Sequence, residues 1–288
     1  MKKYLLSDDQ KNYISVQRFF PGMTNMNICR FRFFNNADRD KLKKAVGIFG
    51  SICDTAGMII DTEDENHPCF AVSKKPEIVI EECHFAERRQ DFYKYLYFLT
   101  VGEFDLGKNL LRYGIVDFDD NSAALIVVFF HLAADFYGST VAMKKISQLY
   151  EKLISDETID LSEKMPSYFD YLDSRDDYSK TKAYNRDISF FREYYNREYR
   201  LGSLYEKKNK SRRIKGFADF FAENSLFPVL MGEDEKKALS KVSDICSVSE
   251  AHVLSAVFEL LCCAYMGEKR IGLSFFYNGR YGAEKEIV

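Results

Sequence analysis

The 288-residue chain lacks three features that would assign a protein class directly: a strong net charge, a long apolar run and a recognisable leader. Its formal net charge of −3 argues against a general binder of nucleic acids or anionic membranes. The longest apolar run, Ala123–Phe130, is too short to span a bilayer and predicts a core strand. The N-terminal segment becomes acidic before any hydrophobic region develops, so we expect a cytoplasmic protein.

Paired cysteines and clustered metal ligands are also missing. The 7 cysteines are scattered without C-x-x-C spacing, which predicts reduced thiols rather than a disulfide framework. His67 and Cys69 lie close together, but no second ligand pair accompanies them. The glycines at 47, 50 and 102 form no phosphate-binding loop. We therefore expect neither a metal site nor a cofactor bound by the chain itself.

Hydrophobic periodicity in the first half predicts an α+β fold, a mixed α/β sandwich in which helices pack on a sheet. Strands are expected at 26–34, 110–118 and 123–130, the last two joined as a hairpin by the polar turn 119–122. Further short apolar runs lie at 58–60, 69–72 and 78–80. Helices are expected at 36–56 (capped by Asn36 or Asp38), 86–99 and 137–153.

The second half is divided by charged segments. Helices are expected at 184–199, 234–243 and 249–265, and β-prone stretches lie at 217–221 and 270–277. The basic segment 206–215 is interpreted as a solvated connection between lobes, with a phosphate-binding patch as the alternative. We therefore predict a first lobe at 1–176, a helical and basic linker at 177–215, and a short, partial second lobe at 216–288.

The most informative stretch is the end of the apolar run, where His131 is followed four residues later by Asp135 and then by a predicted helix. An imidazole at the end of a buried strand is well placed to act as a general base. The carboxylate suits a helix N-cap. Ser139 lacks the Gly-x-Ser-x-Gly turn of a hydrolase nucleophile. On these residues alone, a histidine satisfied by backbone hydrogen bonds is the favoured interpretation.

The surroundings of His131 change that interpretation. Five consecutive segments together resemble the condensation domains of nonribosomal peptide synthetases. They are residues 104–107, residues 110–112, the hairpin, residues 130–135 and a helix that reaches Tyr150. That family belongs to the chloramphenicol acetyltransferase superfamily, whose signature H-H-x-x-x-D-G ends a core strand. Weaker matches lie at residues 5–10 with Gln10, at the Tyr-x-Asp-Tyr motif of 168–171, at 247–258, and at 279–280 with Glu284.

The resemblance implies a chloramphenicol-acetyltransferase-like lobe, with helices packed on a mixed sheet, followed by a partial second lobe of the same kind. It implies an acyltransferase that joins an acyl or aminoacyl thioester, held on the phosphopantetheine of a carrier protein, to an amine or hydroxyl acceptor. His131 would activate or position the acceptor, while Asp135 would pair with an arginine, for which Arg280 is the candidate. Acyl or peptidyl carrier proteins or neighbouring synthetase modules would be the partners.

Several positions depart from the family pattern. Phe130 replaces the first histidine of the pair, Phe136 replaces the glycine, and Ile52 and Gly57 stand where the family has arginines. These departures support an alternative function, a catalytically degenerate domain that only docks carrier proteins or partner modules. The chain ends before the family's later Gly-x-Phe-Val-Asn segment, so we expect a fragment of a longer protein. Candidate side chains lining a substrate tunnel are Phe130, Phe136, Tyr137 and Ser139.

Overall fold

The computed structural model describes residues 3–6, 8–19, 27–64, 67–72, 78–195, 230–267, 271 and 285–288. The chain divides into two compact units. The first unit comprises Met1–Thr181 together with Asn278–Val288, and the second comprises Lys182–Tyr277. The predicted first lobe lies within the first unit, whereas residues 278–288, which we assigned to the second lobe, group with the first.

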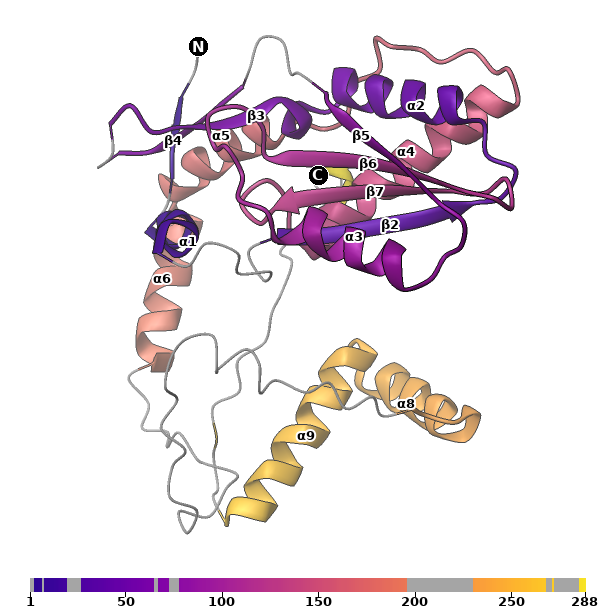
Figure 1. Ribbon diagram of the computed structural model, residues 1–288. Coiled ribbons are helices and arrows are strands. Elements are labelled where there is room, and N and C mark those ends of the chain that lie inside the picture. The colour runs from indigo at the N-terminus through magenta and orange to yellow at the C-terminus, as the bar shows by residue number, and fades with distance from the viewer. Residues whose placement is uncertain are drawn as a thin grey trace. The chain divides into compact units, whose positions relative to one another are not determined.

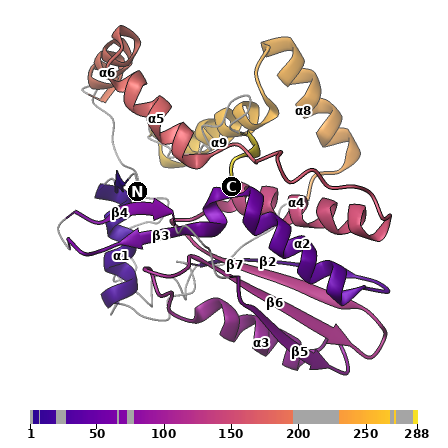
Figure 2. The ribbon, with the colours of Figure 1, turned by 90° about the horizontal axis from the view of Figure 1, so that it is seen from above.

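The main sheet of the first unit has the order β2-β7-β6-β5, formed by Asn27–Phe34, Ala123–Phe130, Leu111–Phe118 and Ile80–Phe85. The pairs β2/β7 and β7/β6 are antiparallel, while β5 and β6 are parallel, so the predicted hairpin and mixed sheet are confirmed. All of β7 is buried. A continuous apolar run suits this central position because helices cover both faces of the sheet. Figure 2 shows α2 and α4 on one face and α3 on the other.

The three helices on this sheet are Arg39–Ile52 (α2), Gln90–Val101 (α3) and Phe136–Ile154 (α4). Of the two predicted caps of α2, Asp38 is the actual one, and its side chain accepts a hydrogen bond from the Lys41 backbone N–H at 3.0 Å. Asn36 instead has a positive φ in the preceding turn. The helix expected to reach residue 56 ends at Ile52 because Cys53 is extended, and a 3₁₀ turn, Asp54–Gly57, follows.

A smaller antiparallel sheet has the order β1-β4-β3, formed by Tyr4–Leu5, Cys69–Val72 and Met58–Asp61. The helix Tyr168–Ser179 (α5) contacts it, since the Tyr4 hydroxyl donates to Asp173 at 3.1 Å and the rings of Tyr4 and Phe169 lie 5.0 Å apart. The helix Asp8–Phe19 (α1) was not among the predicted elements. Figure 1 shows the arrangement of these elements.

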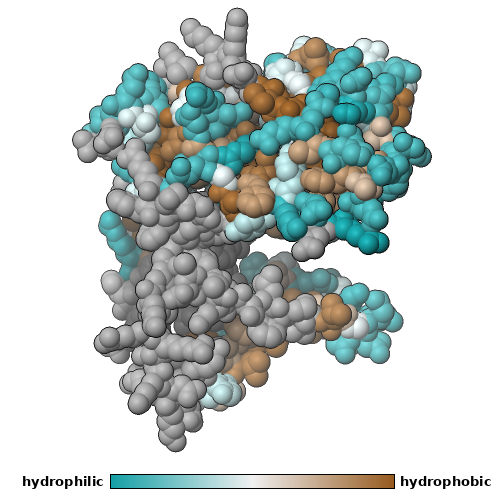
Figure 3. Space-filling model, in the orientation of Figure 1, coloured by the Kyte–Doolittle hydropathy of each residue, from teal (hydrophilic) through white to brown (hydrophobic). Residues whose placement is uncertain are grey.

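The second unit contains Lys182–Tyr195 (α6), Glu233–Cys246 (α8) and Glu250–Met266 (α9), which confirms the three predicted helices. Among its described residues only Cys262 is buried. Apolar residues are therefore visible on the surface of α8 and α9 in Figure 3. The basic segment 206–215, the stretch 217–221, nearly all of 270–277 and Arg280 lie outside the described residues.

In the part of the chain that the structure describes, no single helix is long and apolar enough to cross a membrane. The helices α8 and α9 reach the required length and composition only when taken together, and the two are bent by 100° relative to each other.

Candidate functional site

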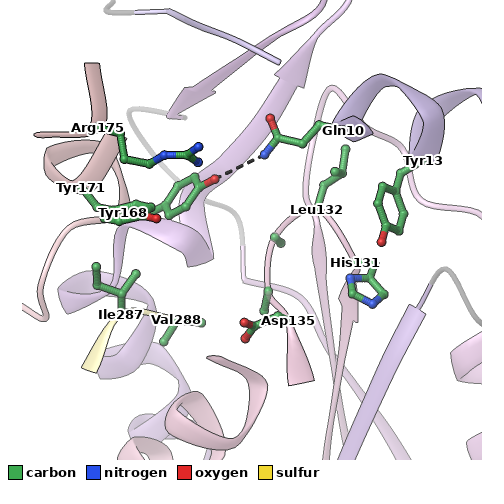
Figure 4. A pocket seen from close by; sticks show the side chains of 12 residues that line it. Gln10, Tyr13, His131, Leu132, Asp135, Tyr168, Tyr171, Arg175, Ile287 and Val288 are labelled. Atoms are coloured by element: carbon green, nitrogen blue, oxygen red, sulfur yellow. Dashed lines mark hydrogen bonds between the residues drawn. The ribbon is translucent and has the colours of Figure 1, made fainter. Parts of the chain in front are cut away.

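A cavity of about 270 Å³ lies within the first unit, beside the end of β7 (Figure 4). Its walls come from α1, the segment that connects β7 to α4, α5 and the last described residues. The lining side chains are Gln10 and Tyr13, residues 131–135, Tyr168, Tyr171 and Arg175, and Ile287 and Val288. The cavity thus gathers segments that are far apart in sequence, and His131 and Asp135 both border it.

His131 follows directly on the last residue of β7, and it is half-buried in the cavity wall. The chain turns immediately after the strand, with the Ala133 backbone N–H donating to the Phe130 carbonyl at 2.8 Å. The imidazole lies beside the ring of Tyr13, with ring centroids 5.1 Å apart and planes inclined by 38°. The buried strand therefore fixes the backbone of this histidine, while an aromatic neighbour from α1 contacts its ring.

Asp135 is the N-cap of α4. Its Oδ1 accepts a hydrogen bond from the Gly138 backbone N–H at 2.6 Å, and its carbonyl accepts from the Ser139 N–H at 2.9 Å. A side-chain cap satisfies one of the free N–H groups at a helix start, and it holds the connection from β7 in place. Arg280 lies outside the described residues, so its ion pair with Asp135 stays a prediction.

Phe136 is the first residue of α4, and the residue is 71% exposed. The Arg30 guanidinium stacks on this ring, with Cζ 3.7 Å from the centroid. The same guanidinium donates to the Phe136 carbonyl and to the Ser139 hydroxyl, both at 2.9 Å. Phe136 is not among the described non-glycine residues with positive φ, so this position does not need the conformational freedom of the family's glycine.

The four candidate tunnel-lining residues do not border this cavity. Phe130 is fully buried in the core, with its ring 5.8 Å from that of Phe104, because it ends a strand that is covered on both faces. Ser139 is buried beside Arg30, whereas Phe136 and Tyr137 are exposed. A place along a tunnel that extends beyond the cavity stays a prediction for these side chains.

The segment at which the family carries arginines is held by other interactions. Ile52 is buried and its carbonyl accepts from the Met165 N–H at 3.0 Å, while Asp54 accepts from the Ser167 hydroxyl at 2.6 Å. Burial, assisted by the nearby Asp54 carboxylate, raises the pKa of the Cys53 thiol to about 12. This segment therefore supports the wall that carries α5, and it contributes no charge to the cavity.

Sequence reasoning missed four lining residues. Tyr13 lies one helical turn after Gln10, and Arg175 one turn after Tyr171, so helical spacing from the recognised motifs would have indicated both. Ile287 and Val288 have no local signal, because tertiary packing brings them to the cavity. In the part of the chain that the structure describes, no group of three or more His, Cys, Asp or Glu residues is arranged to hold a metal ion.

Solved structures with the same fold support the architecture. The starter condensation domain of the rhizomide synthetase RzmA, determined as a mutant in complex with C8-CoA and Leu-SNAC, superimposes with a TM-score of 0.74 at 14% identity, covering 99% of this chain and 63% of that one. The same domain in another structure gives 0.60 at 14% identity, covering 71% and 50%. The first condensation domain of the calcium-dependent antibiotic synthetase, with a substrate analogue, gives 0.73 at 13% identity, covering 100% and 67%.

At these identities the solved structures establish the fold alone, and this chain spans between half and two thirds of their length. No curated protein sequence matches the chain significantly. The sequence profile of the condensation-domain family, however, matches residues 1–287, almost the whole chain. The chain therefore belongs to the condensation-domain family.

Proposed function

We propose that this chain is part of a condensation-type acyltransferase of nonribosomal peptide synthesis. It would join an acyl or aminoacyl thioester on a carrier protein's phosphopantetheine to an amine or hydroxyl acceptor. The observation that carries this proposal is the placement of His131 at the end of the buried strand β7, bordering a cavity together with Asp135 and the tyrosine motif of α5. A relative of the same fold was determined with C8-CoA and Leu-SNAC, which is consistent with thioester chemistry.

In the proposed reaction the acceptor nitrogen forms a bond to the thioester carbonyl carbon, the C–S bond breaks, and the carrier thiol leaves. An imidazole nitrogen of His131 takes the proton that the acceptor loses and passes it to the departing sulfur, or it orients the acceptor for attack. Asp135 keeps the backbone of the connection in place through its cap on α4. Arg280 is the proposed ionic partner of Asp135. Carrier proteins or neighbouring modules are the proposed partners.

The test is transfer between two loaded carrier proteins, followed by intact mass spectrometry of the acceptor carrier. Removal of a general base lowers the rate about 10²–10⁴-fold, so His131→Ala should show a loss in this range. His84→Ala is a matched control, because His84 is exposed, bonds to Asp119 and is not part of the cavity lining. Equal transfer by the wild type and His131→Ala would refute a catalytic role for this histidine.

A second function is favoured by the departures from the motif. Phe130 is locked in the core, Phe136 is stacked on Arg30, and no arginine occupies positions 52–58. A domain with these features could dock carrier proteins without catalysis. In that case the wild type would bind a loaded carrier with the same affinity as His131→Ala, and neither would transfer the acyl group. Carrier affinity measured beside the transfer assay separates the two functions.

A further inference from the structure

Arg175 of α5 borders the same cavity as His131. Figure 4 shows the guanidinium and the imidazole on opposite sides of this space. Within the described ranges, no carboxylate forms an ion pair with Arg175, and its guanidinium carbon lies 5.9 Å from the centroid of the Tyr171 ring. A positive charge therefore lies across the cavity from the proposed base.

Among the described side chains of α5, two aspartates are engaged with other partners. Asp173 accepts a hydrogen bond from the Tyr4 hydroxyl at 3.1 Å, and Asp177 accepts from Lys180 at 3.5 Å. Asp135, the acidic residue in the cavity lining, caps α4 through Oδ1. The charge of Arg175 is thus left available to a molecule in the cavity.

The helix that carries Arg175 is held at several points. The Ser167 hydroxyl caps α5 by accepting from the Phe169 and Asp170 N–H groups at 3.1 and 3.3 Å. The Gln10 amide donates to the Tyr168 hydroxyl at 3.4 Å, which joins α5 to the α1 wall of the cavity. A helix held in this way fixes the backbone that carries the guanidinium, which lowers the entropy lost when Arg175 binds an anion.

We propose that Arg175 selects substrates that carry a carboxylate, which it binds while the reacting group lies next to His131. A planar guanidinium forms two parallel hydrogen bonds to a carboxylate, so this side chain matches that ligand in both charge and shape. The carboxylate belongs to the acyl donor or to the acceptor. This inference deepens the proposed function and rests on it for the identity of the ligand as a substrate.

The test compares two thioesters of N-acetylcysteamine that have acyl chains of equal length, hexanoyl and adipoyl, the second ending in a carboxylate. Binding is measured by titration calorimetry without an acceptor. Because hydrogen bonds to charged groups are stronger than those between neutral groups, a donor carboxylate that binds Arg175 should make the wild type bind the adipoyl probe at least about tenfold more tightly. Arg175→Gln should abolish the preference, whereas Arg175→Lys, which keeps the charge, should retain part of it.

Lys180→Gln is the matched control, because it removes a positive charge from the C-cap of the same helix, outside the cavity lining. It should leave the preference unchanged. A wild type that prefers neither the adipoyl thioester nor, in the acceptor titrations below, the glutamate ester would overturn the inference, as would an Arg175→Gln variant that keeps either preference. An Arg175-dependent preference for pantetheine 4′-phosphate over pantetheine, without a carboxylate preference in either set of titrations, would also overturn it, because the ligand would then be a phosphate.

A second set of titrations tests the acceptor, with esters of glutamate and glutamine in place of the thioesters. A preference for the glutamate ester that depends on Arg175 would support a carboxylate on the acceptor.

The inference and the proposed function can fail separately. His131→Ala should keep the carboxylate preference, since His131 is not the anion-binding group. If the preference depends on Arg175 but no acyl transfer occurs, the proposed function fails and the binding site remains. If transfer occurs without any preference, the inference alone fails.

Discussion

Asp135 combines two properties that single substitutions can separate, a hydrogen-bond acceptor and a negative charge. The acceptor caps α4, and the charge is the proposed partner of Arg280. Asp135→Ala removes both, and loss of an N-cap should lower the free energy of unfolding by about 1 kcal/mol. Asp135→Asn keeps an acceptor, so its stability should stay close to that of the wild type. Urea denaturation measures both variants.

The same pair of variants tests the charge in the transfer assay. A paired carboxylate that shapes the site would make Asp135→Asn slow although it is stable. Wild-type transfer rates in Asp135→Asn would show that the carboxylate acts only as a cap.

The ring of Phe136 stabilises the helix start through its contact with Arg30. A cation–π contact at an exposed site contributes about 0.5–1 kcal/mol, so Phe136→Leu, which keeps an apolar side chain, should lower the free energy of unfolding by roughly this amount. Phe136→Gly, which restores the family residue, should cost more, because glycine is also unfavourable in a helix. Arg30→Lys with Phe136→Leu in a double-mutant cycle isolates the pair; additive losses would contradict the stacking.

Burial makes Cys53 unreactive. Its pKa of about 12 lies above the ordinary value of 9.0, so the thiol is neutral in the folded state. That neutral form favours folding below pH 9, and the contribution is lost as the pH rises toward 12. Because the thiolate is the nucleophile, iodoacetamide at pH 8 should modify the exposed Cys246 much faster than Cys53, as followed by peptide mass mapping. Comparable rates for the two cysteines would contradict the burial of Cys53.

At the scale of elements, α2 and α4 pack together over one face of the main sheet. Ala45 on α2 and Ala142 on α4 are both fully buried, so a larger side chain at either position would extend into the core. Ala142→Leu should lower the free energy of unfolding by about 1–3 kcal/mol through overpacking. Lys144→Leu on the exposed side of α4 adds a similar side chain without this penalty. Equal urea midpoints for the two variants would contradict close packing at Ala142.

These elements also show what the sequence could predict. The continuous apolar run of β7 and the polar turn before it indicated a buried hairpin, because both signals are local. The periodic face of α2 was recognised for the same reason. The helix α1 was not predicted, because its apolar residues form only a weak periodic pattern. This helix has little contact with the core, and Ile14 is the one buried residue among those described in it. Length and periodicity therefore decided which elements could be recognised.

The site was predictable where it depends on one local transition. His131 and Asp135 stand at a strand-to-helix junction that the sequence shows directly. The pairing of Tyr13 with His131 depends on how α1 packs, and the approach of Ile287 to the cavity depends on the tertiary fold. Phe136 was predicted to line a substrate tunnel, and its stacking on Arg30, with the side chain exposed, depends on tertiary packing for which the sequence has no local signal.

At the scale of the whole molecule, the two units differ in how much apolar surface they bury. The first unit contains the connected hydrophobic core, whereas Cys262 is the one buried residue among those described in the second. The helix α9 exposes large apolar side chains that include Leu260, Leu261 and Tyr265. The chain spans between half and two thirds of the length of the solved relatives.

Hydrogen exchange should show this difference between the units. Amides open locally with free energies that follow the apolar contacts around them. Peptides from β7, which is paired on both sides and fully buried, should therefore exchange only on global unfolding. Peptides from α9, Glu250–Met266, should exchange at least about 100-fold faster, which corresponds to a difference of about 2.7 kcal/mol in opening free energy. Mass spectrometry follows the exchange of both peptides. Equal protection of β7 and α9 would contradict this prediction and would show that α9 buries its apolar face in solution.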